Sequence, residues 1–304
     1  MRGQRRWILS LAICGALSCS VNSQNRTANN MSSTIIYTST VADDRSATTL
    51  KVAPDGAGEL TVGSNRDRRA QPVGRFEAAV HAALLRRLLA LVASLEFKGL
   101  GSAAGLLPGD PYREIRVRQA GTDELVKTVG AGKNVSPVFL EAEQAVQAII
   151  QHLMAYPTVA ITMNVDRLPQ RVDQRETLLD VILHNVGRTP FRLTAPVEWG
   201  KSQTNCELAA VRDVPDSALT LADQKFANLG GSAVVAATKP VEGVFFTLQP
   251  GESAAVRFRY AFQWPPGAYR VEITLSLVLT GADGKPLFAG NMAAGPYRIE
   301  VAGR

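Results

Sequence analysis

The hydrophobic pattern of this chain changes its period at Pro157. Before this residue, segment 138–156 carries apolar side chains at helical spacing, whereas in 159–165 apolar and polar side chains alternate as in a strand. Segments with these two periods bury their apolar faces in different ways. Together with the length of 304 residues, the change predicts two domains, 34–156 and 157–304.

The first domain is predicted to combine strands with two amphipathic helices. Three β-branched segments between residues 35 and 63 predict strands, and a hairpin is predicted at 114–129. The second helix is predicted at 138–156. The first is predicted at 76–95 from residues spaced as on one helix face: Phe76, Val80, Ala83, Leu84, Leu88, Leu91 and Leu95. The order βββαββα predicts an α+β fold, here a two-layer α/β-sandwich with both helices on one face of a sheet.

The second domain is predicted to be an Ig-like all-β sandwich. Apolar side chains alternate with polar ones along 256–262 and 269–277, and a hairpin turn is predicted at 281–284. Residues 200–240 do not fit this strand pattern and are predicted to form a long insertion. Because long loops in compact domains are usually functional or disordered, the insertion is the candidate binding surface.

Both domains have segments that resemble proteinase inhibitors. Segments 85–91 and 110–117, together with the order of elements around them, are similar to emfourin, a bacterial inhibitor of thermolysin-like metalloproteases. The turns at 248–253 and 266–269 are similar to those of the BsuPI family of proteinase inhibitors. The resemblance implies a secreted protease as the partner.

The N-terminus has the pattern of an export signal. A basic start is followed by an apolar region of eleven residues, 7–17, shorter than the roughly 20 residues that span a bilayer. Segment 16–19, Ala-Leu-Ser-Cys, resembles the lipobox of bacterial lipoproteins. The resemblance implies that residues 1–18 are a signal peptide and that Cys19 is lipidated. The alternative is an ordinary secretory signal cut nearby, which would leave a secreted or periplasmic protein.

Segment 19–33 is rich in Asn and Ser and is predicted to be a flexible tether, because it has too little apolar surface to offset its ordering entropy. The protein is therefore expected in the bacterial cell envelope, held by its lipid. By resemblance to enteric lipoproteins, the absence of Asp at Ser20, after the lipidated cysteine, implies the outer membrane in cells that have one. Besides Cys19, the processed chain keeps only Cys206, expected to be buried, with a free thiol or an intermolecular link as alternatives.

The charge of the chain gives no indication of nucleic-acid binding. Three of the six net positive charges belong to the signal peptide, which leaves +3 for the processed chain. The densest basic run, 66–69, is interpreted as a solvated loop. No basic face with aromatic side chains and no known nucleic-acid motif accompanies it.

No pattern of catalytic or cofactor-binding residues is found. His81, His152 and His184 lack the spacing of metal ligands and are expected at surface or boundary positions. The Gly-rich segment 99–105 follows a predicted helix instead of a strand, so it is interpreted as a flexible loop and not as a dinucleotide site.

The acidic pairs Asp43/Asp44 and Glu141/Glu143 have no partner motif, and the glutamates face different directions on their helix. We therefore expect no catalytic residues, cofactor or metal, and no enzyme. The predicted function is that of a lipid-anchored envelope protein that binds another protein. The alternatives are a proteinase inhibitor and a structural spacer or scaffold of the envelope.

Overall fold

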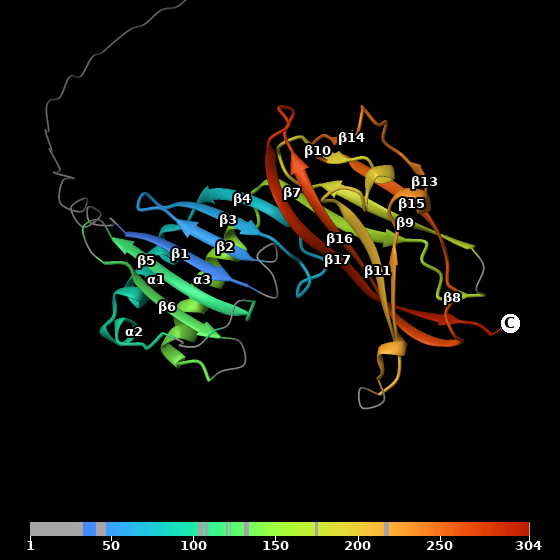
Figure 1. The fold of residues 1–304 in the computed structure, drawn as a ribbon. Coiled ribbons are helices and arrows are strands. Elements are labelled where there is room, and N and C mark those ends of the chain that lie inside the picture. Colours follow the sequence, from blue (N-terminus) through green and yellow to red (C-terminus); the bar gives the residue numbers. More distant parts are fainter. Residues whose placement is uncertain are drawn as a thin grey trace, which may run out of the picture. The chain divides into compact units, whose positions relative to one another are not determined.

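The computed structural model describes residues 33–40, 47–102, 106, 109–119, 121, 123–130, 134–173, 176–215 and 219–303 (Figure 1). The predicted signal peptide, Cys19 and all of the predicted tether except Ser33 lie outside these residues and stay predictions. Residues 33–304 form one compact unit. Within the described ranges, no helix has both the length and the apolar character needed to cross a membrane.

Ten strands form one antiparallel sheet that extends along most of this unit (Figure 1). Its order is β13-β15-β9-β7-β4-β3-β2-β1-β5-β6. The strands are β1 (Ser33–Ser39), β2 (Thr48–Val52), β3 (Ala57–Val62), β4 (Val73–Ala79), β5 (Tyr112–Gln119), β6 (Leu125–Gly130), β7 (Pro157–Asp166), β9 (Glu176–Asn185), β13 (Val234–Ala237) and β15 (Ser253–Ala261). Helices α1 (Ala82–Ala93), α2 (Leu95–Lys98) and α3 (Pro137–Leu153) pack together, with α3 against β3 and β4.

A second sheet faces the β13-β15-β9-β7 end of the first. It contains β12 (Gln224–Asn228), β11 (Asn205–Arg212), β16 (Gly267–Thr280), β10 (Phe191–Thr194) and β14 (Phe245–Leu248) in that order; β17 (Pro286–Val301) pairs with β16 and with β8 (Arg171–Val172). Short 3-10 helices η2 (Pro196–Glu198), η4 (Leu221–Asp223) and η5 (Gly231–Ala233) lie between strands. One apolar core fills the space between the sheets, and in it the rings of Trp199 and Phe258 are 5.9 Å apart.

The predicted fold class is wrong. Seventeen strands and only three α-helices are found in the described residues, so the unit is mainly β and is not a two-layer α/β-sandwich followed by an Ig-like domain. One cause is local: Phe76 pairs with Leu60 of β3, so the predicted helix 76–95 begins as strand β4. Helix α1 starts only after His81, whose side chain accepts a hydrogen bond from the backbone of Ala83.

A second cause is the pairing of β4 with β7, which continues the sheet past Pro157. Gly74 of β4 has a φ of 145°, and a Cβ atom there would lie 2.1 Å from the carbonyl oxygen of Val159 in β7. Only glycine permits this close approach of the two strands. The domain boundary near Pro157 stays a prediction, with the added finding that a strand pair crosses it.

Candidate functional site

The three histidines lie on separate elements and make structural hydrogen bonds. His81 caps α1, a ring nitrogen of His152 on α3 lies 3.0 Å from the carbonyl oxygen of Ala79, and one of His184 on β9 lies 2.9 Å from Ser253 Oγ. In the described ranges, no group of three or more His, Cys, Asp or Glu side chains is placed to hold a metal ion. The site must therefore be sought among other side chains.

Cys206 lies on β11 and is fully buried, which confirms the expected burial. Burial raises the pKa of its thiol, so the thiol stays protonated. Of the acidic pairs, Asp43 and Asp44 lie outside the described residues, as do positions 103–105 of the Gly-rich loop. Glu141 is exposed, whereas Glu143 is buried.

Glu143 is the centre of a buried polar network that the sequence did not reveal. Tyr37 of β1 donates a hydrogen bond of 2.9 Å to Glu143 Oε1, and Arg113 of β5 donates one of 2.6 Å to Oε2. Burial, reinforced by the charge of Glu143, raises the pKa of the Tyr37 hydroxyl well above its usual range. The network joins α3 to two strands and keeps the carboxylate paired, as burial of a charge requires.

The basic run belongs to a loop that is docked on the second sheet. We call residues 63–72, between β3 and β4, the arginine loop. Asn65 is buried, and its Nδ2 donates hydrogen bonds to the carbonyl oxygens of Arg69 and Gln71. Its Oδ1 accepts a hydrogen bond of 2.7 Å from the backbone nitrogen of Ala293 in β17. The basic run 66–69 is a loop in which Arg66, Asp67 and Arg68 are exposed, as predicted, while the buried Asn65 and the half-buried Arg69 anchor it.

Two arginines of this loop share one carboxylate. Arg69 pairs with Glu272 of β16 at 2.5 Å, and Arg66 pairs with it at 3.4 Å. Glu272 is more than 200 positions away in the sequence, so this docking depends on the fold of the second sheet.

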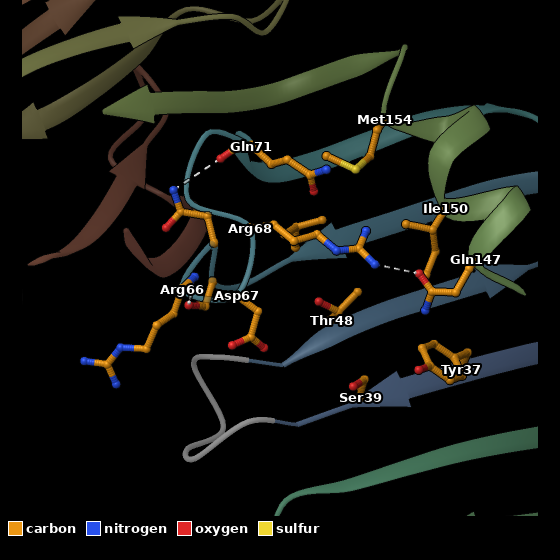
Figure 2. A pocket seen from close by; sticks show the side chains of 13 residues that line it. Tyr37, Ser39, Thr48, Arg66, Asp67, Arg68, Gln71, Gln147, Ile150 and Met154 are labelled. Carbon is orange, nitrogen blue, oxygen red and sulfur yellow. Dashed lines mark hydrogen bonds between the residues drawn. The ribbon is translucent and has the colours of Figure 1, made fainter. Parts of the chain in front are cut away.

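A pocket of about 130 Å³ lies beneath the arginine loop (Figure 2). Its walls are β1, β2 and β3, the loop itself and α3; its lining residues are Tyr37, Ser39, Thr48, Val62, Ser64, Asn65, Arg66, Asp67, Arg68, Gln71, Gln147, Ile150 and Met154. Figure 2 shows Arg68 reaching across to α3, where its Nη2 donates a hydrogen bond of 3.1 Å to Gln147 Oε1. The pocket thus combines charged, hydroxyl, amide and apolar groups.

The predicted insertion 200–240 contains the edge hairpin of the second sheet. We call β11, β12 and the residues between them the edge hairpin. Phe226 of β12, opposite Ala209 of β11, is 74% exposed, and Leu221 of η4 is 86% exposed. Figure 1 shows the end of the hairpin that carries η4 projecting beyond the neighbouring strands. On its outer edge, β12 pairs with no strand among the residues described.

The η4 end of the edge hairpin is held by polar contacts. Asp223 accepts hydrogen bonds from the backbone and the hydroxyl of Thr220, which lower the pKa of its carboxyl. Arg212 donates to the carbonyl of Pro266 at 3.1 Å, and Asp213 pairs with Arg298 at 3.4 Å. These contacts fix the direction of a hairpin whose large apolar side chains face solvent.

Comparison with known proteins identifies no family. No protein-family model matches the chain, and no curated protein matches it. Among solved structures, it is similar to the putative ApaA protein of Bordetella pertussis, with 12% identity and a TM-score of 0.26 over 48% of this chain and 96% of that one.

Two enzymes give similarly weak matches. The alkylpurine DNA glycosylase AlkC of Pseudomonas fluorescens is 14% identical, with a TM-score of 0.22 over 53% of this chain and 40% of that one. AvmM, which catalyses macrocyclization in alchivemycin A biosynthesis, is 13% identical, with a TM-score of 0.25 over 46% of this chain and 87% of that one. TM-scores this low carry no argument about function.

Proposed function

We propose that this protein is a non-enzymatic envelope protein that binds another protein through its edge hairpin. The observation that carries the proposal is the exposure of Leu221 and Phe226 on one hairpin at a free sheet edge. Exposed apolar groups on a projecting element are typical of recognition surfaces, because their burial in a complex is favourable. The surface lies inside the insertion for which the sequence predicted binding.

The occupant we propose is an extended segment of the partner that adds to β12 as a further strand. The outer backbone groups of β12 are available for such pairing, and main-chain hydrogen bonds would supply affinity. Phe226 shares its face of β12 with Gln224 and Asn228, so an apolar side chain of the partner would cover Phe226 between two polar neighbours.

The test is a crosslinking pull-down from envelope extract with the soluble chain and a Leu221→Asp/Phe226→Asp variant. Leu95→Asp is the matched control, because Leu95 on α2 is also 86% exposed but lies outside the hairpin. We expect the hairpin variant to lose a partner that the wild type and the control retain. Equal recovery with all three proteins would exclude the hairpin. Recovery of no partner by the wild type would favour the spacer or scaffold function instead.

The proteinase-inhibitor alternative is a narrower form of the same proposal. The polar contacts at the η4 end of the edge hairpin favour it, because a loop that inserts into a protease must keep its shape and resist cleavage. A panel of metalloproteases and serine proteases, with the protein at stoichiometric concentration, tests this form. We expect inhibition that the Leu221→Asp/Phe226→Asp variant lacks. No inhibition of any protease in the panel would leave binding without inhibition.

The lipid anchor is proposed from the lipobox resemblance alone. Metabolic palmitate labelling should mark the wild-type protein and should not mark Cys19→Ser, because the cysteine thiol carries the lipid in bacterial lipoproteins. Label that persists in Cys19→Ser would contradict the anchor and favour a secreted or periplasmic protein.

A further inference from the structure

We propose that the pocket beneath the arginine loop binds a small zwitterion of amino-acid size, with its carboxylate on Arg68 and its amino group on Asp67. The proposal does not depend on the edge hairpin, since the arginine loop and β1 to β3 lie in a different part of the fold.

Arg68 differs from the other two arginines of its loop. Arg66 and Arg69 are both paired with Glu272, whereas Arg68 donates to the neutral amide of Gln147 and has no carboxylate within 4 Å among the described residues. A guanidinium group has five donors, and the contact with Gln147 uses only part of them. Its remaining donors suit a planar carboxylate, which arginine binds with two parallel hydrogen bonds.

Asp67 lines the same pocket, and its negative charge favours a zwitterion over a simple anion as the ligand. Its carboxylate makes no hydrogen bond or ion pair with any described residue, including its neighbour Arg68. A carboxylate so placed repels an anion but attracts an amino group. A ligand with both groups would bridge two opposite charges that do not contact each other in the free protein.

The remaining lining residues provide both polar and apolar surface, as a small amino acid requires. Ser39, Thr48 and Ser64 supply hydroxyl groups, which either donate or accept. Ile150 and Met154 of α3 add apolar surface on the opposite wall (Figure 2). An amino acid with a small apolar or hydroxyl side chain would satisfy both walls.

The size and rigidity of the pocket set the ligand class. A volume of about 130 Å³ is close to that of the roughly 150 Å³ cavity that holds benzene, so the ligand has few non-hydrogen atoms. The arginine loop is fixed by the Asn65 hydrogen bonds and by Glu272, so little ordering would accompany binding.

Isothermal titration of the purified chain with L-alanine, L-serine and L-leucine tests the proposal. Ethylamine and propionate are the matched probes, because each lacks one charged group of alanine. We expect at least one amino acid to bind, and propionate and ethylamine to bind at least about tenfold more weakly than alanine, the loss of one charged hydrogen-bonded contact. If no amino acid binds, or if propionate binds as well as alanine, the zwitterion proposal is overturned.

Two variants locate the contacts, and a third is the control. Arg68→Gln and Asp67→Asn alter exposed side chains, so both should fold, as thermal unfolding checks. Each should weaken binding of the preferred amino acid by about tenfold or more. Arg75→Gln, on β4 and paired with Glu77, lies outside the pocket lining and should bind like the wild type. Unchanged binding in Arg68→Gln would overturn the assignment of the carboxylate to Arg68.

Discussion

The arginine loop and the connection within the edge hairpin both carry charged residues between neighbouring antiparallel strands. The side chains of the first contact the second sheet, whereas the large apolar side chains of the second are exposed to solvent. The arginine loop directs Asn65 into the second sheet and two of its arginines onto Glu272. The edge hairpin has an ion pair near its η4 end and leaves Leu221 and Phe226 in solvent.

The difference shows which polar groups hold the molecule together. A connection whose buried hydrogen bonds reach another sheet contributes to the free energy of unfolding of the whole unit. A connection that exposes apolar groups loses little when it opens, and its surface is available to a partner. We therefore expect changes in the arginine loop to affect stability and changes in the edge hairpin to affect binding.

The largest expected effect is that of Asn65→Ala. Removal of this amide leaves the backbone nitrogen of Ala293 and the carbonyls of Arg69 and Gln71 without their partner. Each unpaired buried group costs about 1–3 kcal/mol, so we expect the free energy of unfolding to fall by about 3 kcal/mol. Urea denaturation followed by circular dichroism measures this loss.

Asn228→Ala is the matched control in the edge hairpin. Asn228 is exposed, and its Oδ1 accepts a hydrogen bond of 2.7 Å from the backbone nitrogen of Gly230. Because water can replace this bond, we expect a loss of about 1 kcal/mol or less. If Asn65→Ala and Asn228→Ala lowered the free energy of unfolding equally, the arginine loop and the edge hairpin would contribute equally to stability, and the proposed difference between them would be wrong.

A smaller effect is expected from Glu272→Gln, which removes the charge shared by Arg66 and Arg69. Its side chain is 19% exposed, so the ion pairs are only partly screened by water. We expect the free energy of unfolding to fall by about 1–2 kcal/mol, with a smaller difference from wild type at high salt.

Asp213→Asn is the corresponding change near the η4 end of the edge hairpin. Asp213 is 33% exposed and lies 3.4 Å from Arg298, so its loss should cost about 0.5 kcal/mol. Denaturation at low and high salt compares the two variants. A larger loss for Asp213→Asn would contradict the view that the hairpin adds little to stability.

Local periodicity predicted individual elements better than it predicted their assembly. The alternation along 256–262 and 269–277 is confirmed by β15 and β16, and the helix predicted at 138–156 is confirmed by α3. Residues 76–79 of β4 were predicted to be helical because Phe76 fits a helical stripe as well as a strand. Pairing of β4 with β7 decides between these two possibilities, and such a non-local contact leaves no local pattern.

The candidate sites could be predicted only in part from the sequence. The insertion was recognised as a candidate surface, but its strands were not, because β12 has few large apolar residues. Glu143 could have been placed on the buried face of α3, since it lies four residues after Phe139 and three before Val146. The role of the arginine loop could not be predicted, because Glu272 and Ala293 meet it only after both sheets have formed.

The smallest expected effect concerns acid, and it compares the sheet with the edge hairpin. Asp180 of β9 is buried and accepts two hydrogen bonds from Arg257, which lower the pKa of its carboxyl below the unfolded value of about 3.9. A lowered folded-state pKa gives stability that is fully present above the unfolded pKa and is lost as the pH falls through the folded pKa. Below about pH 4, wild type should therefore lose more stability than Asp180→Asn.

Asp223 in the edge hairpin also has a lowered pKa, held down first by the hydroxyl of Thr220, so the sign of its linkage is the same. The η4 end of the hairpin carries exposed side chains, and we expect it to open before the two sheets unfold, so the global transition should not register the protonation of Asp223. The test is the urea concentration at the midpoint of unfolding, measured between about pH 2 and pH 5. As the pH falls, this midpoint should decrease in Asp223→Asn as it does in wild type, and should decrease less steeply in Asp180→Asn. If the midpoint of Asp223→Asn decreased toward low pH as weakly as that of Asp180→Asn, the hairpin would unfold only together with the sheets. The edge hairpin would then contribute to the free energy of unfolding of the whole unit, as the arginine loop does.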